Sequence, residues 1–221
     1  MGKRILKVVA FCMLLFGVVA GISRLVERKE SRQKMQPFLD HAGEYDVLFL
    51  GDSIMNTGVF PMEMWEKYGI AGYNIASYGN TLPITYWALQ NALDYAKPKL
   101  VVLDVQGVSK SYKLSGNSSD VHTAFDCYSI SKTKIEALDD LMDDPNAVDD
   151  DGVAYVDMKW EYLFTLGKYH ARWSELTDTD FHPVYNREKG AKSVIAVADV
   201  GDYDLIDEDM ATEESGQTGF V

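Results

Sequence analysis

The alternation of hydrophobic and polar positions divides the chain into an apolar N-terminal run and a longer body. Residues 5–22 are eighteen mostly apolar residues that include Lys7 and have basic residues on both sides. A helix that crosses the hydrocarbon core of a bilayer needs about 17–25 such residues, and a lysine near its end can extend its amine to the membrane surface. The pattern predicts a transmembrane helix over residues 1–23 that acts as a signal anchor.

The same run has a second interpretation, in which it is a signal peptide that is removed. Val18 and Ala20 stand before Gly21 in the arrangement of a cleavage site. Basic residues ahead of the run favour a cytoplasmic N-terminus. We therefore expect a single-pass protein of the cell membrane with an extracytoplasmic body, or a secreted body if the run is cleaved.

The body begins with a polar segment at 24–44, which we expect to be a helical stalk, and continues with short aliphatic runs. These runs are predicted strands near 46–50, 72–75 and 100–104, and a helical pattern over 83–96 separates the last two. Strands that alternate with helices predict a parallel α/β sheet, in which polar groups gather at the carboxyl ends of the strands.

Downstream of the third strand the pattern predicts two more helices and an acidic loop. One helix covers 129–141 with Ser131 as its N-cap, and an aromatic-rich helix covers 160–176. The loop DDPNAVDDDG between them is predicted to be solvated, since its spacing does not give the alternating ligands of a calcium loop. The chain ends on Gly-Phe-Val after an acidic stretch, which suggests a truncated protein that continues into a further element.

Charge and cysteine content narrow the functional classes. The net charge is −13, but residues 1–35 hold eight Lys/Arg and two Asp/Glu, so the remainder is near −19. Such a body would repel a phosphate backbone, and we expect no nucleic-acid partner. Cys12 and Cys127 are too few for a disulfide framework or a thiolate metal site. Neither G-x-G-x-x-G nor a phosphate loop is present, so the sequence predicts no cofactor and no metal.

The candidate chemistry lies directly after the first predicted strand, at Gly51, Asp52 and Ser53. Glycine permits a tight turn, the serine hydroxyl is placed above the sheet edge, and the Ser53 backbone N–H can donate to an oxyanion. The alternative is a turn without catalysis, in which Asp52 or Ser53 only caps the following helix. Ser53 is thus the candidate nucleophile.

This turn and its neighbours resemble the SGNH/GDSL hydrolase superfamily, and most closely its membrane-anchored extracytoplasmic members in Gram-positive bacteria. The matching segments are DVLFLGDS, FPMEMWEKYGIAGYNIASYGN and KPKLVVLDV, with KYHARWSELTDTDF similar to a mid-chain stretch of the narrower group. The resemblance implies a three-layer flavodoxin-like sandwich with a parallel sheet over 45–221, in incomplete form. By the same resemblance Ser53 is the nucleophile, and Ser53 and Gly79 form the oxyanion hole, with Asn80 as a further amide donor.

The chain departs from the family pattern in two places. The third block, usually Gly-X-Asn-Asp, is replaced by Asp104, Gln106 and Gly107. The terminal Asp-X-X-His is imitated by Asp178 and His182, the candidate acid and base, although they are four residues apart and Asp180 is only two from the histidine. We therefore expect the true histidine to lie beyond the given residues, and the alternative is that His182 is the base. The other three histidines carry no family motif: His41, His122 and His170.

The resemblance implies a serine esterase or acyltransferase that acts on acyl esters, with acetyl as the expected group, of a cell-surface glycan or another surface polymer. No cofactor is implied. The alternative is a non-catalytic surface or envelope-assembly protein that retains the fold.

Overall fold

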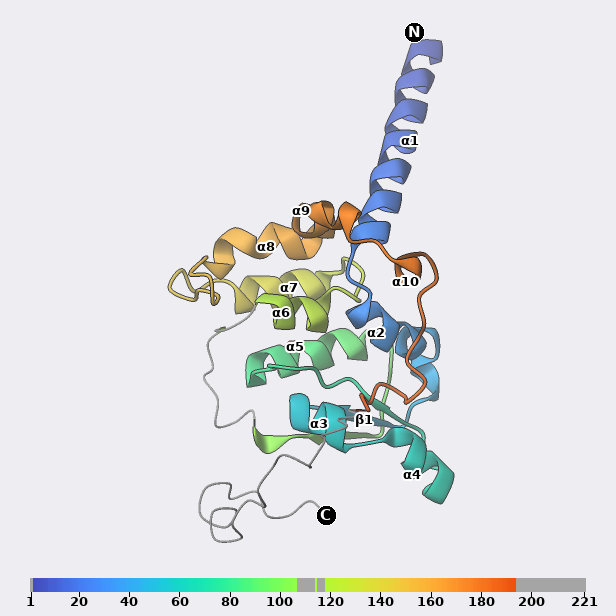
Figure 1. Ribbon diagram of the computed structural model, residues 1–221, viewed down its shortest axis with the longest axis vertical. Coiled ribbons are helices and arrows are strands. Elements are labelled where there is room, and N and C mark those ends of the chain that lie inside the picture. Colours follow the sequence, from blue (N-terminus) through green and yellow to red (C-terminus); the bar gives the residue numbers. More distant parts are fainter. Residues whose placement is uncertain (1, 107–113, 115–117, 194–221) are drawn as a thin grey trace, which may run out of the picture.

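The structure is a computed structural model that describes residues 2–106, 114 and 118–193. Helix α1 (Gly2–Val26) projects from one end of the body as a single rod (Figure 1). It is long and apolar enough to cross a membrane, and none of its apolar window is buried in the body. The N-terminal apolar helix is therefore confirmed, as a helix compatible with a membrane anchor or a signal.

Helix α2 (Glu30–Asp40) packs into the body. Met35 and Phe38 are buried, and the Phe38 ring lies 5.3 Å from that of Tyr73 on the sheet. A short 3-10 helix, η1 (Ala42–Glu44), then leads into the first strand. The segment that we expected to be a polar stalk is helical, but its apolar face belongs to the core.

Three parallel strands form a sheet in the order β2-β1-β3. They are β1 (Val47–Leu50), β2 (Gly72–Asn74) and β3 (Leu100–Leu103). Val47 pairs with Gly72 on one side and with Leu100 on the other. Every residue of β1 is buried, as expected for the central strand of a parallel sheet. The three predicted strands and their direction are confirmed.

Most of the helices that follow β2 and β3 stack in successive layers between the sheet and α1, whereas the two short helices that follow β1 lie on the side of the sheet away from α1 (Figure 1). Two short helices follow β1, one helix connects β2 to β3, and the remaining helices lie beyond it toward α1. Their bounds are α3 (Ser53–Gly58), α4 (Pro61–Tyr68), α5 (Leu82–Leu93), α6 (Ser118–Phe125), α7 (Lys132–Leu141), α8 (Tyr155–Leu163), α9 (Thr165–Tyr169), η3 (His170–Ser174) and α10 (Asp178–Phe181). The described part is thus an α/β protein with a small sheet.

Two of the downstream predictions have different outcomes. The Ser131 hydroxyl accepts a hydrogen bond from Lys134 N at 3.0 Å, so the predicted N-cap of α7 is confirmed. The helical prediction over 160–176 holds for most of the segment, which is divided into the end of α8, α9 and η3. Phe164 leaves the helical conformation and ends α8, and Thr165 begins α9, which packs against α1. A tertiary contact has therefore overridden local helical propensity.

Candidate functional site

The turn after β1 depends on glycine at position 51. Gly51 has a φ of 150°, and a Cβ added there would overlap Asp104 Cβ. The Gly51 carbonyl accepts hydrogen bonds from Ser77 N at 3.3 Å and from Asn80 Nδ2 at 3.2 Å. These bonds join the turn after β1 to the loop after β2, which holds the two segments at one edge of the sheet.

Ser53 is the first residue of α3, and Asp52 is its cap. The Asp52 carboxylate accepts a hydrogen bond from Ile54 N at 3.0 Å and is buried. Ser53 is half-buried, and its hydroxyl has no hydrogen-bond partner among the described residues. The cap is therefore provided by the aspartate, and the serine hydroxyl has no part in the turn's own hydrogen bonds.

Gly79 lies in the loop after β2, at the same carboxyl edge as Ser53. Its φ of 66° is in the left-handed region, and an added Cβ would overlap the Asp120 carboxylate of α6. The structure therefore brings Ser53 and Gly79 to the ends of adjacent strands. It also places a carboxylate against Gly79, where negative charge opposes a developing oxyanion.

Asn80 connects the two loops. Its side chain is buried, and Nδ2 donates to the Gly51 carbonyl, while Oδ1 has no partner in the described part of the chain. One of its two amide hydrogens is consequently committed to the backbone. The contact gives Asn80 a positioning role at the turn.

Asp104 follows β3 and completes this edge. Its N–H donates to the Leu50 carbonyl at 2.9 Å, and its Oδ1 accepts from Gln106 N at 2.8 Å. Its other oxygen is buried without a partner among the described residues. Gly107, the third residue of this altered block, lies outside the described residues, as does the chain end at 202–221. No group of three or more metal-ligating side chains is found in the described ranges.

Asp178 and His182 lie far from Ser53. They belong to the α10 segment beside α2 and the base of α1, whereas α3 lies on the sheet side (Figure 1). Both side chains are exposed. Asp180 is instead buried and caps α10, accepting from Thr177 N at 2.9 Å and from Arg172 Nη2 at 3.3 Å. The residues that imitate a catalytic block thus terminate a short helix and fix it to the rest of the body.

His122 and Asp126 form a buried pair that sequence analysis missed. His122 Nδ1 lies 2.9 Å from Asp126 Oδ1, and Tyr169 donates to Asp126 Oδ2 at 2.9 Å. The imidazole, only 2% exposed, stacks on Tyr162 with ring centroids 3.8 Å apart. The available signal was the spacing of four residues, which places both side chains on one face of α6.

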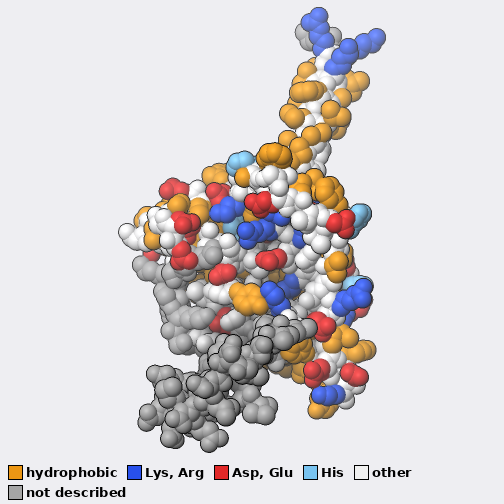
Figure 2. Space-filling view, in the orientation of Figure 1, with side chains coloured by type: hydrophobic (Ala, Val, Ile, Leu, Met, Phe, Trp, Pro, Cys, Tyr) orange, Lys and Arg blue, Asp and Glu red, His pale blue; other side chains and the backbone are white. Residues whose placement is uncertain are grey.

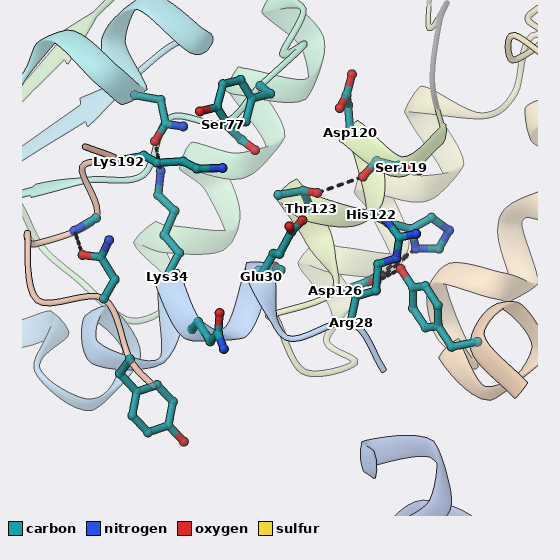
Figure 3. A pocket seen from close by; sticks show the side chains of 18 of the residues that line it. Arg28, Glu30, Lys34, Ser77, Ser119, Asp120, His122, Thr123, Asp126 and Lys192 are labelled. Atoms are coloured by element: carbon teal, nitrogen blue, oxygen red, sulfur yellow. Dashed lines mark hydrogen bonds and ion pairs between the residues drawn. The ribbon is translucent and has the colours of Figure 1, made fainter. Parts of the chain in front are cut away.

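A cavity of about 900 Å³ separates this pair from the turn (Figure 3). It lies between α2, α6, η3 and residues 184–192. Asn56 and Ser77 line it, so that it begins beside the turn after β1, but Ser53 is not one of its lining residues. Asp120, His122 and Asp126 line the cavity. Its lining also includes five cationic side chains: Arg28, Lys34, Lys168, Arg172 and Lys192.

Lys34 fixes the wall of the cavity nearest the turn. Its Nζ donates to Asn56 Oδ1 at 2.6 Å and to the carbonyl of Ala76. Burial lowers the pKa of Lys34 to about 7, and repulsion from Lys192 acts in the same direction. This amine thus links α2 to α3 and to the loop after β2.

Comparison of the chain with models of protein families, with curated proteins and with solved structures gives no match. No family is therefore shown, and the resemblance to SGNH hydrolases stays a prediction from the motifs.

Proposed function

We propose that this protein is a membrane-anchored serine esterase or acyltransferase of the SGNH type, with an extracytoplasmic body and an acylated cell-surface glycan or related polymer as its substrate. One observation carries the proposal: in the turn after the central strand, Asp52 caps α3 and the Ser53 hydroxyl is left without a partner among the described residues. Such a hydroxyl is suited to nucleophilic attack once a base is supplied.

In the proposed reaction, Ser53 Oγ attacks the carbonyl carbon of the ester while its proton passes to a base. The carbonyl oxygen becomes an oxyanion, for which the N–H groups of Ser53 and Gly79 are the expected donors. Collapse of this intermediate breaks the bond to the alcohol, which takes the proton and leaves. Water or a second hydroxyl then cleaves the acyl-serine and restores the enzyme.

No histidine among the described residues lies where it could act as the general base for Ser53. His182 and His170 lie near α1, and His122 is bonded to Asp126 across the cavity from the turn. His41 precedes β1 and so lies at the opposite edge of the sheet from Ser53. General-base assistance contributes about a hundred- to ten-thousand-fold. We therefore expect slow turnover from the described residues alone.

A fluorophosphonate probe tests the nucleophile directly, because it reacts covalently with activated serines. Because the described residues supply no base for Ser53, we expect slow labelling of the full chain in detergent micelles during prolonged incubation, and loss of that labelling in Ser53→Ala. Ser77→Ala is the matched control, since Ser77 lies at the same sheet edge and donates its N–H to Gly51. Labelling that persists in Ser53→Ala, or that never occurs, would refute the esterase proposal.

A second function, a non-catalytic surface or assembly protein that binds glycan, is favoured by the charge at the site. The carboxylates of Asp104 and Asp120 abut Gly51 and Gly79, and neither helps an oxyanion. In this case glycan fragments should bind the chain in calorimetric titrations with the same affinity before and after Ser53→Ala.

A further inference from the structure

Aromatic side chains surround the base of α1. Trp173 is 73% exposed and Phe164 is 61% exposed, and Trp160 and Phe181 are exposed as well. The Trp160 and Phe164 rings stack with centroids 6.0 Å apart, which joins them into one apolar surface. We call these residues the aromatic rim: Trp160, Phe164, Trp173 and Phe181.

The rim flanks the contacts that hold α1 to the body. Helices α9, η3 and α10 all contact α1. Ser23 Oγ lies 3.1 Å from Thr165 Oγ1, and Arg172 Nη1 donates to the Val26 carbonyl at 2.5 Å. Phe164 immediately precedes Thr165, and Trp173 immediately follows Arg172. The exposed rings are thus attached to the residues that touch the last turn of α1.

The position of that turn fixes the depth of the rim. The headgroup region on each side of a bilayer is about 5–8 Å deep, from a hydrocarbon core of about 30 Å and a total of about 40–45 Å. If the apolar run spans the core, the four residues Ser23–Val26 rise about 6 Å beyond it, at about 1.5 Å each. Thr165 and Arg172 then lie at headgroup depth.

We propose that the aromatic rim docks on the lipid bilayer, so that α8, α9, η3 and α10 lie against the headgroups. Tryptophan favours this depth, because its ring is apolar and its N–H is polar. The surface is continuous with α1 itself, which commits the proposal to a bilayer as its partner. It rests on the membrane-anchored part of the proposed function and is independent of Ser53.

Basic side chains lie at the junction beside the rim. Figure 2 shows hydrophobic side chains around the base of α1, with Lys and Arg side chains gathered just below them. Arg24 and Arg28 are exposed at the junction of α1 and α2. Residues 155–181, which include α8, α9, η3 and α10, hold three Lys/Arg and five Asp/Glu, so the docking proposal rests on the aromatic rings and on the contacts with α1, and attraction to anionic headgroups is confined to the basic junction.

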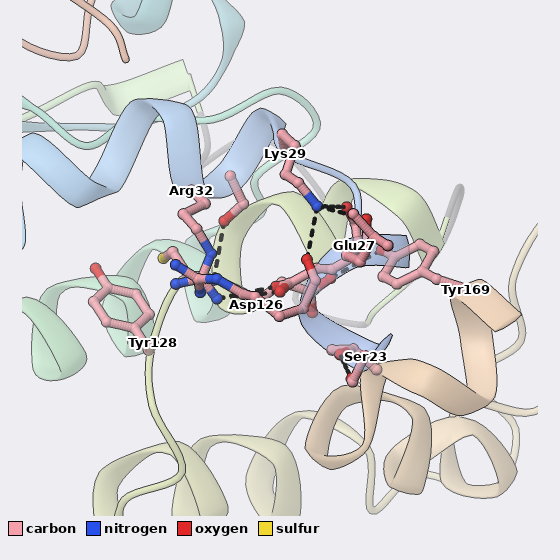
Figure 4. Close-up of polar contacts among 12 residues, drawn as sticks. Ser23, Glu27, Lys29, Arg32, Asp126, Tyr128 and Tyr169 are labelled. Atoms are coloured by element: carbon pink, nitrogen blue, oxygen red, sulfur yellow. Dashed lines mark hydrogen bonds and ion pairs between the residues drawn. The ribbon is translucent and has the colours of Figure 1, made fainter. Parts of the chain in front are cut away.

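The junction beneath the rim is firmly held (Figure 4). Lys29 Nζ donates to the carbonyls of Arg24 at 2.7 Å and Leu25 at 2.9 Å, which closes the end of α1. Glu27 pairs with Arg32 at 3.1 Å. Burial, followed by repulsion from Asp126, raises the pKa of Glu27 to about 7. These contacts keep the body from turning away from the bilayer.

Fluorescence quenching in membranes tests the proposal. The full chain is reconstituted in phosphatidylcholine–phosphatidylglycerol vesicles whose acyl chains are brominated near the headgroups. One variant keeps only Trp173, and the matched control keeps only Trp65, with the other tryptophans replaced by phenylalanine. Trp65 is also well exposed, at 55%, but it lies on α4 at the end of the molecule remote from α1 (Figure 1).

We expect Trp173 to be quenched severalfold more strongly than Trp65 and to emit at shorter wavelength. Flotation of the same vesicles after an alkaline wash reports on the anchor separately. A chain that fails to float would overturn the anchor and the docking together. A chain that floats with equal quenching of both tryptophans would overturn the docking alone, while the fluorophosphonate result for Ser53 would be unaffected. Far-ultraviolet circular dichroism checks that both variants are folded.

Discussion

The turn after β1 and the buried pair on α6 contain complementary halves of serine-hydrolase chemistry. Ser53 is half-buried and has no base among the described residues, whereas His122 is bonded to Asp126, stacks on Tyr162 and lines the cavity on the side away from the turn. A nucleophile and its base must lie within about 2.6–3.2 Å of each other or share a water. The comparison shows that suitable residue types in one fold do not make a site unless the packing brings them together.

Burial gives the two regions different roles. The Asp126 carboxylate is bonded by His122 on its own helix and by Tyr169 on α9, so it connects two helices in the interior. The other ring nitrogen of His122, Nε2, is buried without a partner among the described residues, so the polar network is satisfied at the carboxylate and incomplete at the imidazole. Ser53 makes no comparable link through its hydroxyl among the described residues. The α6 pair therefore connects two helices, and the turn after β1 stays the chemical site that we propose.

The largest expected effect tests this division. Asp126→Ala leaves the His122 imidazole and the Tyr169 hydroxyl buried without their partner, and we expect a loss of about 3 kcal/mol in the free energy of unfolding. Urea unfolding in micelles measures it, with His170→Ala as an exposed control. Fluorophosphonate labelling of Ser53 should persist wherever the variant remains folded. If labelling disappears from the folded variant, the two regions form one site after all.

The next largest effect concerns the loop that meets Ser53. Gly79→Ala combines a left-handed φ with overlap of the Asp120 carboxylate, whereas Gly69→Ala has the same φ of 66° and nothing within 4 Å. We expect Gly69→Ala to cost about 1 kcal/mol of unfolding free energy from backbone strain alone. Gly79→Ala should cost more and also reduce labelling of Ser53. Equal costs in thermal unfolding would show that the contact with Asp120 is dispensable.

A smaller effect concerns Lys34, which lines the cavity between the turn and the α6 pair. It makes the free energy of unfolding depend on pH. The folded protein holds the pKa of Lys34 near 7, below its value of 10.5 in an unfolded chain. The unfolded state therefore binds an extra proton between these values, and stability from this group is lost as pH falls from about 10.5 to 7. The slope is at most about 1.4 kcal/mol per pH unit.

Lys34→Met should lack this slope between pH 7 and 9. Lys132→Met is the control, because Lys132 is exposed at the start of α7. Urea unfolding of the three proteins at several pH values gives the slopes. Parallel slopes in the wild type and Lys34→Met would contradict the placement of this amine away from water.

For the last variant, His182→Ala, we expect no effect on reactivity. His182→Ala should change neither fluorophosphonate labelling nor the rate of aryl acetate turnover, because His182 is exposed beside α10. A complete loss of turnover with an intact fold would make His182 the base and would require α10 to move to the sheet edge.

Local sequence patterns correctly predicted the features that depend on residues close together in the chain, namely the strands and one helix cap. The strands near residues 47–50, 72–74 and 100–103 follow from aliphatic runs, and the Ser131 cap follows from one hydroxyl before an amphipathic helix. The arrangement of Ser53 and Gly79 at one edge follows from parallel topology, which places successive strand ends together.

Long-range contacts could not be predicted in this way. The break at Phe164 depends on α9 meeting α1, and nothing between residues 160 and 176 encodes the Ser23–Thr165 contact. The use of Asn80 as a link to Gly51, in place of a free amide donor, depends on a bond between residues 29 positions apart. No helix was predicted around His122 and Asp126, and the packing of these side chains depends on Tyr162 of α8 and Tyr169 of α9.

The contacts of α1 with Thr165 and Arg172 limit how far the sheet edge can move relative to the membrane. A rod that is bonded to its body at the base does not act as a flexible tether. With α1 across a bilayer, the sheet edge is held at one working height, on the side of the body remote from the membrane surface (Figure 1). Lipids of the adjoining leaflet then lie out of range of Ser53. The molecules within its range are those that extend outward to that height, as long surface polymers do.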